Sequence, residues 1–144
     1  MKIRIIEPQD IEVCASIFVS TFSKNPWNEA WTLDAALERL WHFYNSKGFY
    51  GLIATETQAL GFVLGNVEPY YTGSLFCLRE MCVAATSQSK GIGTQLLKTL
   101  EEELTLIHVR RIYLLTSHDT PASRFYQKAG YERNETFGIY VRDY

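Results

Sequence analysis

Two glycines, Gly91 and Gly93, stand between an apolar stretch and an amphipathic one, and this junction most constrains the fold. The residues before it, 75–84, form an apolar run of strand length. The residues after it, 92–107, place apolar side chains at helical spacing, with Gln, Lys and Glu on the other side. The sequence therefore predicts a strand, a tight turn and a helix, followed by a strand over 111–117 that completes a parallel βαβ unit.

The glycine turn has the composition of a phosphate-binding site. Glycine admits positive φ and a close ligand, and the first amides of the helix lie unpaired at the positive end of its dipole. Lys90 and the hydroxyls of Ser89 and Thr94 add charge and hydrogen bonds. A nucleoside-triphosphate loop and a dinucleotide fingerprint fit poorly, because no Lys-Ser or Lys-Thr follows Gly93 and position 96 is leucine. By itself, a Gly-x-Gly leaves a ligand-free tight turn equally open.

The remaining pattern predicts one mixed domain over residues 1–144, because no linker, repeat or shift in composition divides it. Further strands are expected at 3–7, 49–55 and 59–67, and two last strands within 131–144. Further helices are expected at 10–22, at 32–48 with Gly48 closing it, and at 120–130, the last begun by Pro121 and ended by a left-handed Gly130.

Bulk composition excludes several classes of function. The formal net charge is -2, whereas nucleic-acid binders usually carry a clear basic excess. The three cysteines and three histidines are scattered, so they predict neither a disulfide framework nor a metal site. The N-terminal apolar run is too short for a signal peptide, and no stretch reaches the length of a membrane span. We therefore expect a cytoplasmic protein without membrane or nucleic-acid partners.

Two motifs resemble those of the GCN5-related N-acetyltransferase (GNAT) family. Residues 88–93, Gln-Ser-Lys-Gly-Ile-Gly, match the family's pyrophosphate signature Q/R-x-x-G-x-G/A. Residues 122–131, Ala-Ser-Arg-Phe-Tyr-Gln-Lys-Ala-Gly-Tyr, resemble its A-x-x-F-Y-x-K-x-G-F segment. The resemblance implies an α+β fold: a mixed, mostly antiparallel sheet of six to seven strands with a central parallel pair, flanked by about four helices.

The resemblance also implies acetyl-CoA as cofactor, with CoA as product. In the family the fourth and fifth strands part, and the backbone exposed there pairs with the pantetheine. By position, this implies the main chain of Met81, Cys82 and Val83, whereas the side chain of Cys82 looks like a small core hydrophobe because no base adjoins it. The implied pyrophosphate contacts are Gln88, Ser89, Lys90, Gly91, Ile92, Gly93 and Thr94. Asp119 stands near the place where the family often has an asparagine that binds pantetheine.

Two residues are implied as catalytic. Tyr126 matches the tyrosine that protonates the departing CoA thiolate in many family members, and the alternative is a structural tyrosine beside the cofactor. Glu80 is the candidate base, because an ammonium must lose a proton before its nitrogen can attack a thioester. The alternatives are ordered water as the base and a salt-bridged strand residue in place of Glu80.

Aromatic residues indicate where an acceptor would bind. Trp27, Glu29 and Trp31 would offer an aromatic wall and an anion to a cationic amine, and Tyr70 and Tyr71 are further candidates. The alternative is that the tryptophans fasten their loop to the core. The resemblance implies direct transfer to a primary amine, either of a polyamine- or aminoglycoside-like small molecule or of a peptide or protein. A non-catalytic acyl-CoA-binding or sensor domain is the alternative from another class, and a homodimer is the alternative to a monomer.

Overall fold

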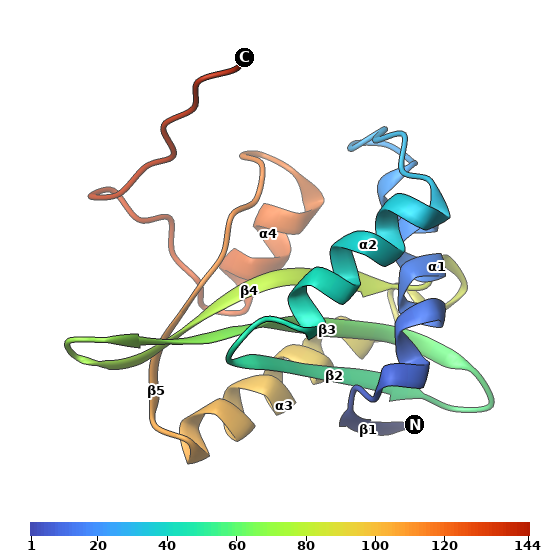
Figure 1. The fold of residues 1–144 in the computed structure, drawn as a ribbon, viewed down its shortest axis with the longest axis horizontal. Coiled ribbons are helices and arrows are strands. Elements are labelled where there is room, and N and C mark those ends of the chain that lie inside the picture. The colour runs from blue at the N-terminus through green and yellow to red at the C-terminus, as the bar shows by residue number, and fades with distance from the viewer.

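The computed structural model describes residues 1–144, whose backbone forms one five-stranded mixed sheet with four α-helices (Figure 1). The strands lie in chain order, β1 to β5. Neighbours from β1 to β4 pair antiparallel, and β4 pairs parallel with β5. The strands are β1 Lys2–Ile5, β2 Phe49–Thr55, β3 Ala59–Tyr70, β4 Gly73–Val83 and β5 Val109–Tyr113.

Helices cover both faces of this sheet. They are α1 Ile11–Phe22, α2 Leu33–Tyr44, α3 Ile92–Leu106 and α4 Pro121–Lys128, with short 3-10 turns at Pro8–Asp10 and Ala85–Ser87. α1 and α2 pack on one face around Phe18 and Phe62, and α3 packs on the other around Phe76 and Leu96. Side chains alternate along a strand, so Phe62 and its neighbour Val63 belong to opposite clusters. None of the helices combines the length and apolar character that crossing a bilayer would require.

Local sequence signals set the helix ends. The hydroxyl of Thr32 accepts a hydrogen bond from the Ala35 amide at the start of α2. Thr120 and Ser123 form a reciprocal capping box on α4, whose first residue is Pro121. Gly130 follows α4 with φ +96°, which confirms the expected left-handed residue. α2 and α4 therefore begin where their own threonines satisfy a terminal amide, whereas α2 ends at Tyr44, before the Gly48 that was expected to close it.

The parallel pair β4–β5 is short, and this leaves an opening between the two strands. Pairing runs only from Ser74 opposite Val109 to Cys77 opposite Tyr113. Beyond that point β4 continues to Val83 along β3 alone, while the chain after Tyr113 leaves the sheet. The strand expected at 111–117 thus begins earlier and ends at Tyr113, because no ladder partner remains for the residues that follow.

The sheet has five strands rather than six or seven because residues 131–144 form none. Their apolar side chains alternate at Phe137, Ile139 and Val141, but these side chains are exposed and no strand pairs with their backbone. Figure 1 shows this segment running away from the sheet. Alternation predicts which way side chains point, whereas a strand also needs a hydrogen-bonding neighbour. The expectation of two last strands was wrong, and the mixed architecture with one parallel pair and four helices is confirmed.

Candidate functional site

The turn between β4 and α3 presents backbone amides to the surface. Gly91 has φ +79°, and no atom lies within 4 Å of the position that a Cβ would take. No side chain caps α3, so the amides of Ile92, Gly93 and Thr94 have no acceptor within the protein. Because these amides also lie at the positive end of a helix dipole, the turn is suited to phosphate oxygens.

Gln88 holds this turn against β4. Its Nε2 donates a 3.0 Å hydrogen bond to the carbonyl of Val83, so the amide side chain acts on the protein itself. Ser89, with φ +63°, and Lys90 are both exposed beside it. The turn therefore has a fixed base and an open polar rim.

The free edge of β4 adjoins this turn. The amide of Ala84 donates to Leu60 on β3, and in an antiparallel ladder every second residue faces the partner. The backbone groups of Cys82 therefore face β3, whereas those of Met81 and Val83 face the side from which β5 has departed. Since Gln88 occupies the Val83 carbonyl, the groups left open are the Val83 amide and both groups of Met81.

Tyr126 closes the far side of the opening. Its hydroxyl lies 3.7 Å from the sulfur of Met81, and its ring packs near Phe125 and Tyr131. Burial raises the pKa of Tyr126 above its ordinary value, and the nearby Cys82 and Glu80 act in the same direction. The phenol therefore keeps its proton at neutral pH.

Glu80 belongs to the same stretch of β4, and its side chain meets α2 on the α1–α2 face of the sheet. It is only 8% exposed, and its Oε1 accepts a 2.7 Å hydrogen bond from Nε of Arg39 on α2. Burial raises the pKa of Glu80, while the hydrogen bond and charge of Arg39 lower it. A buried carboxylate and a protonated phenol thus flank the open backbone of Met81, an arrangement that can take one proton and give another.

Comparison with known proteins places the chain. The profile of the Acetyltransferase (GNAT) family matches residues 12–131, most of the sequence. The chain belongs to the GNAT family. A short stretch of 46 residues is 48% identical to the protein YdhI of Bacillus subtilis (strain 168), and it spans 31% of this chain and 29% of YdhI. The matched stretch is thus less than a third of the length of that relative.

Solved GNAT structures share the whole fold. A possible acetyltransferase from Clostridium difficile 630 superposes with a TM-score of 0.83 at 13% identity, covering 99% of this chain and 98% of that one. A putative acetyltransferase from Agrobacterium tumefaciens str. C58 superposes with a TM-score of 0.79 at 19% identity, covering 99% of this chain and 100% of that one. The aminoglycoside N-acetyltransferase AAC(6')-Iy, solved in complex with CoA, superposes with a TM-score of 0.76 at 19% identity, covering 98% of this chain and 93% of that one. At such identities these neighbours establish the GNAT fold alone.

The tryptophan loop packs mainly on the core of this GNAT domain. Trp27 and Trp31 make edge contacts with Phe22 and Phe18 of α1, at ring-centroid distances of 5.1 and 4.9 Å. The indole of Trp31 also donates a 2.9 Å hydrogen bond to Glu29. Both tryptophans therefore hold their loop against α1, as the alternative interpretation expected. Trp31 also faces the guanidinium of Arg39.

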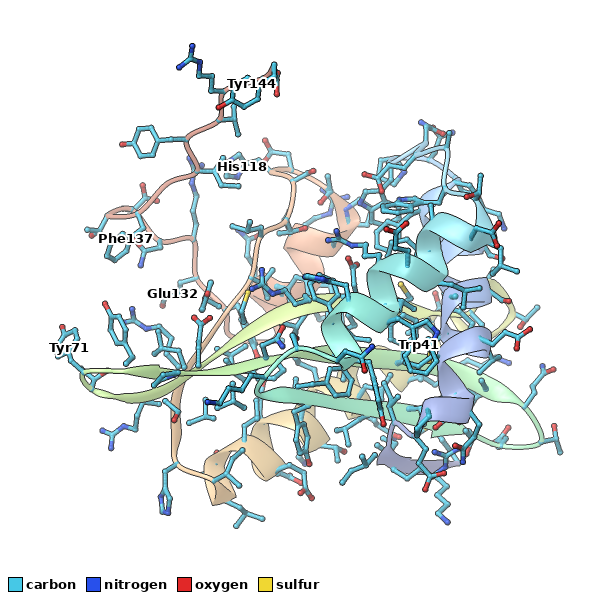
Figure 2. All side chains as sticks on the ribbon, viewed as in Figure 1. Trp41, Tyr71, His118, Glu132, Phe137 and Tyr144 are labelled. Carbon is cyan, nitrogen blue, oxygen red and sulfur yellow. The ribbon has the colours of Figure 1, made fainter.

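Other candidate site residues are not brought to this place. Tyr70 and Tyr71 lie at the tip of the β3–β4 hairpin, and Figure 2 shows Tyr71 at the outer end of that hairpin, far from Trp41 of α2. Asp119 is exposed with φ +57°, and its carboxylate accepts no hydrogen bond. The glycine turn, Met81, Tyr126 and Glu80 therefore lie around the opening. Trp31 is linked to Glu80 by Arg39, which contacts both side chains.

Arg39 is the site residue that sequence reasoning missed. Its guanidinium lies 4.9 Å from the ring centroid of Phe43 and 5.8 Å from that of Trp31. The signal was present, since Arg39 and Phe43 stand four residues apart on the same side of a helix. Only the packing of α2 over β4 reveals that this arginine meets Glu80.

Proposed function

We propose that this GNAT domain is an N-acetyltransferase that moves the acetyl group of acetyl-CoA directly to a primary amine within a ternary complex. The observation that carries the proposal is the departure of β5 from β4 beside the uncapped start of α3. That departure leaves backbone hydrogen-bonding groups of Met81 and Val83 without partners. Because buried backbone groups are rarely left unpaired, a ligand that covers them would be expected to supply the missing partners.

The residues present fit acetyl-CoA. The amides of Ile92, Gly93 and Thr94, with Ser89 and Lys90 beside them, would hold the pyrophosphate. The open groups of Met81 and the Val83 amide would pair with the pantetheine, and Gln88 would act by bracing the turn. When bound, acetyl-CoA supplies a thioester whose acyl carbon an amine can attack.

Glu80 and Tyr126 divide the proton transfers between them. Glu80 takes a proton from the acceptor ammonium, which frees the nitrogen lone pair for formation of the new C–N bond. Tyr126 gives its proton to the sulfur that leaves as the C–S bond breaks. Burial raises the pKa of Tyr126, so the phenol holds a proton at neutral pH, and its place beside Met81 at the opening supports the donor role.

The acceptor is a primary amine that enters from the α1–α2 side, where Glu80, Glu29 and Trp31 lie. An anion beside an aromatic ring suits a cationic amine. The structural neighbour AAC(6')-Iy is an aminoglycoside N-acetyltransferase, so aminoglycosides and polyamines are the first acceptors to test. Peptides with a free N-terminus or lysine form the second group.

The test is an amine panel assayed for release of free CoA, with mass spectrometry of the product. At least one amine is expected to gain an acetyl group, and Glu80→Gln is expected to lower kcat/KM for that amine about 100-fold at neutral pH. Glu103→Gln is the matched control and should leave the rate unchanged, because Glu103 lies on α3, where it accepts a hydrogen bond from Tyr50 of β2. An unchanged rate in Glu80→Gln would remove the assigned base.

Binding without turnover would favour an acyl-CoA sensor instead. Ligand at about 100 times its Kd stabilises a fold by roughly 2.7 kcal/mol, which thermal denaturation detects. Stabilisation by acetyl-CoA with no acetylated amine in the panel would support the sensor. No stabilisation at millimolar acetyl-CoA would contradict the cofactor assignment itself.

A further inference from the structure

Arg39 is held in one place by three contacts. Its Nε donates to Oε1 of Glu80 at 2.7 Å, and its guanidinium lies near the rings of Phe43 and Trp31. Phe43 is buried, and Trp31 is braced against Phe18 of α1. A planar cation fixed in this way loses little further freedom when it bonds a carboxylate. The orientation of Arg39 is therefore set by the fold before any ligand arrives.

Glu80 keeps one oxygen free. Its Oε1 accepts from Arg39, while Oε2 accepts no hydrogen bond. No buried side-chain oxygen in the protein is left without a partner, so Oε2 must reach the surface although Glu80 is only 8% exposed. The carboxylate thus has one oxygen bonded to Arg39 and one accessible oxygen without a partner, and Arg39 determines which of the two is left free.

We propose, resting on the function proposed above, that Arg39 is a positioning residue that aims the free oxygen of Glu80 at the acceptor amine and keeps that carboxylate ionised. A buried carboxylate without a counter-charge favours its neutral form, and a neutral carboxyl cannot accept the ammonium proton. Arg39 supplies the counter-charge without covering Oε2.

The other charged and titratable groups around Glu80 do not replace Arg39. Glu29, from the segment before α2, raises the pKa of Glu80, whereas Arg39 lowers it. Cys82 on β4 and Tyr126 on α4 are the remaining titratable neighbours, and both resist ionisation because they are buried. Arg79, next to Glu80 on β4, lies near the Phe43 ring at 5.6 Å but bonds Asn66 instead. Arg39 is therefore the cation that pairs with this carboxylate.

The test compares pH profiles of kcat/KM for the acceptor in wild type, Arg39→Met, Arg39→Lys and Arg79→Met. Removing the guanidinium should shift the acidic limb to higher pH and lower the ratio of kcat/KM at pH 6 to that at pH 8 about tenfold. Arg39→Lys keeps the charge and should recover part of that ratio. Arg79→Met removes a cation from the same ring and should leave the ratio unchanged.

A direct readout keeps this inference separate from the proposed function. Carboxyl 13C NMR of selectively labelled glutamate, with Glu80 assigned by Glu80→Gln, follows the ionisation of Glu80 without any acceptor. Titration of Glu80 at higher pH in Arg39→Met than in Arg79→Met would support the inference even if no amine were acetylated. Equal titration in folded Arg39→Met and wild type would overturn it, as would an unshifted acidic limb.

Discussion

The hydroxyl of Tyr126 on α4 points at the sulfur of Met81 on β4, 3.7 Å away, across the opening left where β5 departs. Sulfur is a weak acceptor, so little is lost when the phenol turns from Met81 to a better partner. The contact fixes the phenol beside the exposed backbone without consuming its proton.

Replacing Tyr126 by Phe should therefore lower kcat about 100-fold, because the leaving sulfur loses its proton donor, while the KM for acetyl-CoA changes little. Steady-state kinetics of CoA release measures both values. Tyr131→Phe is the matched control, since its hydroxyl bonds Glu101 and its ring lies beside that of Tyr126. A kcat for Tyr126→Phe equal to that of Tyr131→Phe would leave Tyr126 with a structural role only.

Gly91 and Gly130 offer a matched pair for testing the turn. Both have positive φ, and neither has an atom within 4 Å of a Cβ position, so an alanine at either site costs about 1 kcal/mol of backbone strain. Only Gly91→Ala should also weaken CoA binding, by about tenfold, because its methyl group stands beside the open amides of α3. Thermal denaturation and isothermal titration with CoA separate the two effects. Equal CoA affinity in both variants would place the pyrophosphate elsewhere.

Asp10 should make stability depend on pH. Its carboxylate accepts hydrogen bonds from two guanidinium nitrogens of Arg4, at 2.7 and 2.9 Å, and from the Glu7 amide. The Arg4 hydrogen bond lowers the pKa of Asp10, against the effect of burial. A group whose pKa is lowered by folding stabilises the native state above its unfolded pKa and ceases to do so as pH falls through the folded pKa.

Asp10→Asn should consequently cost about 2 kcal/mol at pH 7, and the difference from wild type should shrink below about pH 4. Urea denaturation at several pH values measures it. Glu12→Gln, an exposed acid two residues further along, should show no such trend. If the difference in the free energy of unfolding between Asp10→Asn and wild type stayed constant with pH, the charge of Asp10 would not contribute to stability.

The three cysteines should be unreactive in the native protein. Cys14, Cys77 and Cys82 are free and buried, and burial raises the pKa of Cys14 to about 12 and that of Cys82 well above its ordinary value. Ellman's reagent at pH 8 should therefore titrate almost no thiol before denaturation and all three after it. Rapid native labelling with loss of acetyl transfer would instead point to a covalent thiol mechanism.

Much of the local structure could be predicted from the chain because it depends on neighbouring residues. Thr32 and Thr120 cap their own helices, Gly130 takes the left-handed conformation, and the stripe that includes Leu96 and Leu100 sets α3. These signals are short-ranged, so periodicity and capping chemistry are sufficient to find them. The alternating residues after Tyr131 could not be judged in this way, because a strand depends on a hydrogen-bonding partner far away in the chain, and these residues have none.

The glycine turn, the order of the elements up to Gly130 and the two motifs of a GNAT domain follow from the sequence alone, since each is written in contiguous residues. Only the tertiary structure decided that β5 leaves β4 after Cys77, that Cys82 turns its backbone toward β3, and that Arg39 meets Glu80 across 41 positions of chain. These relationships arise from packing a helix and two strands against one another. Packing depends on the whole core, which no local pattern encodes.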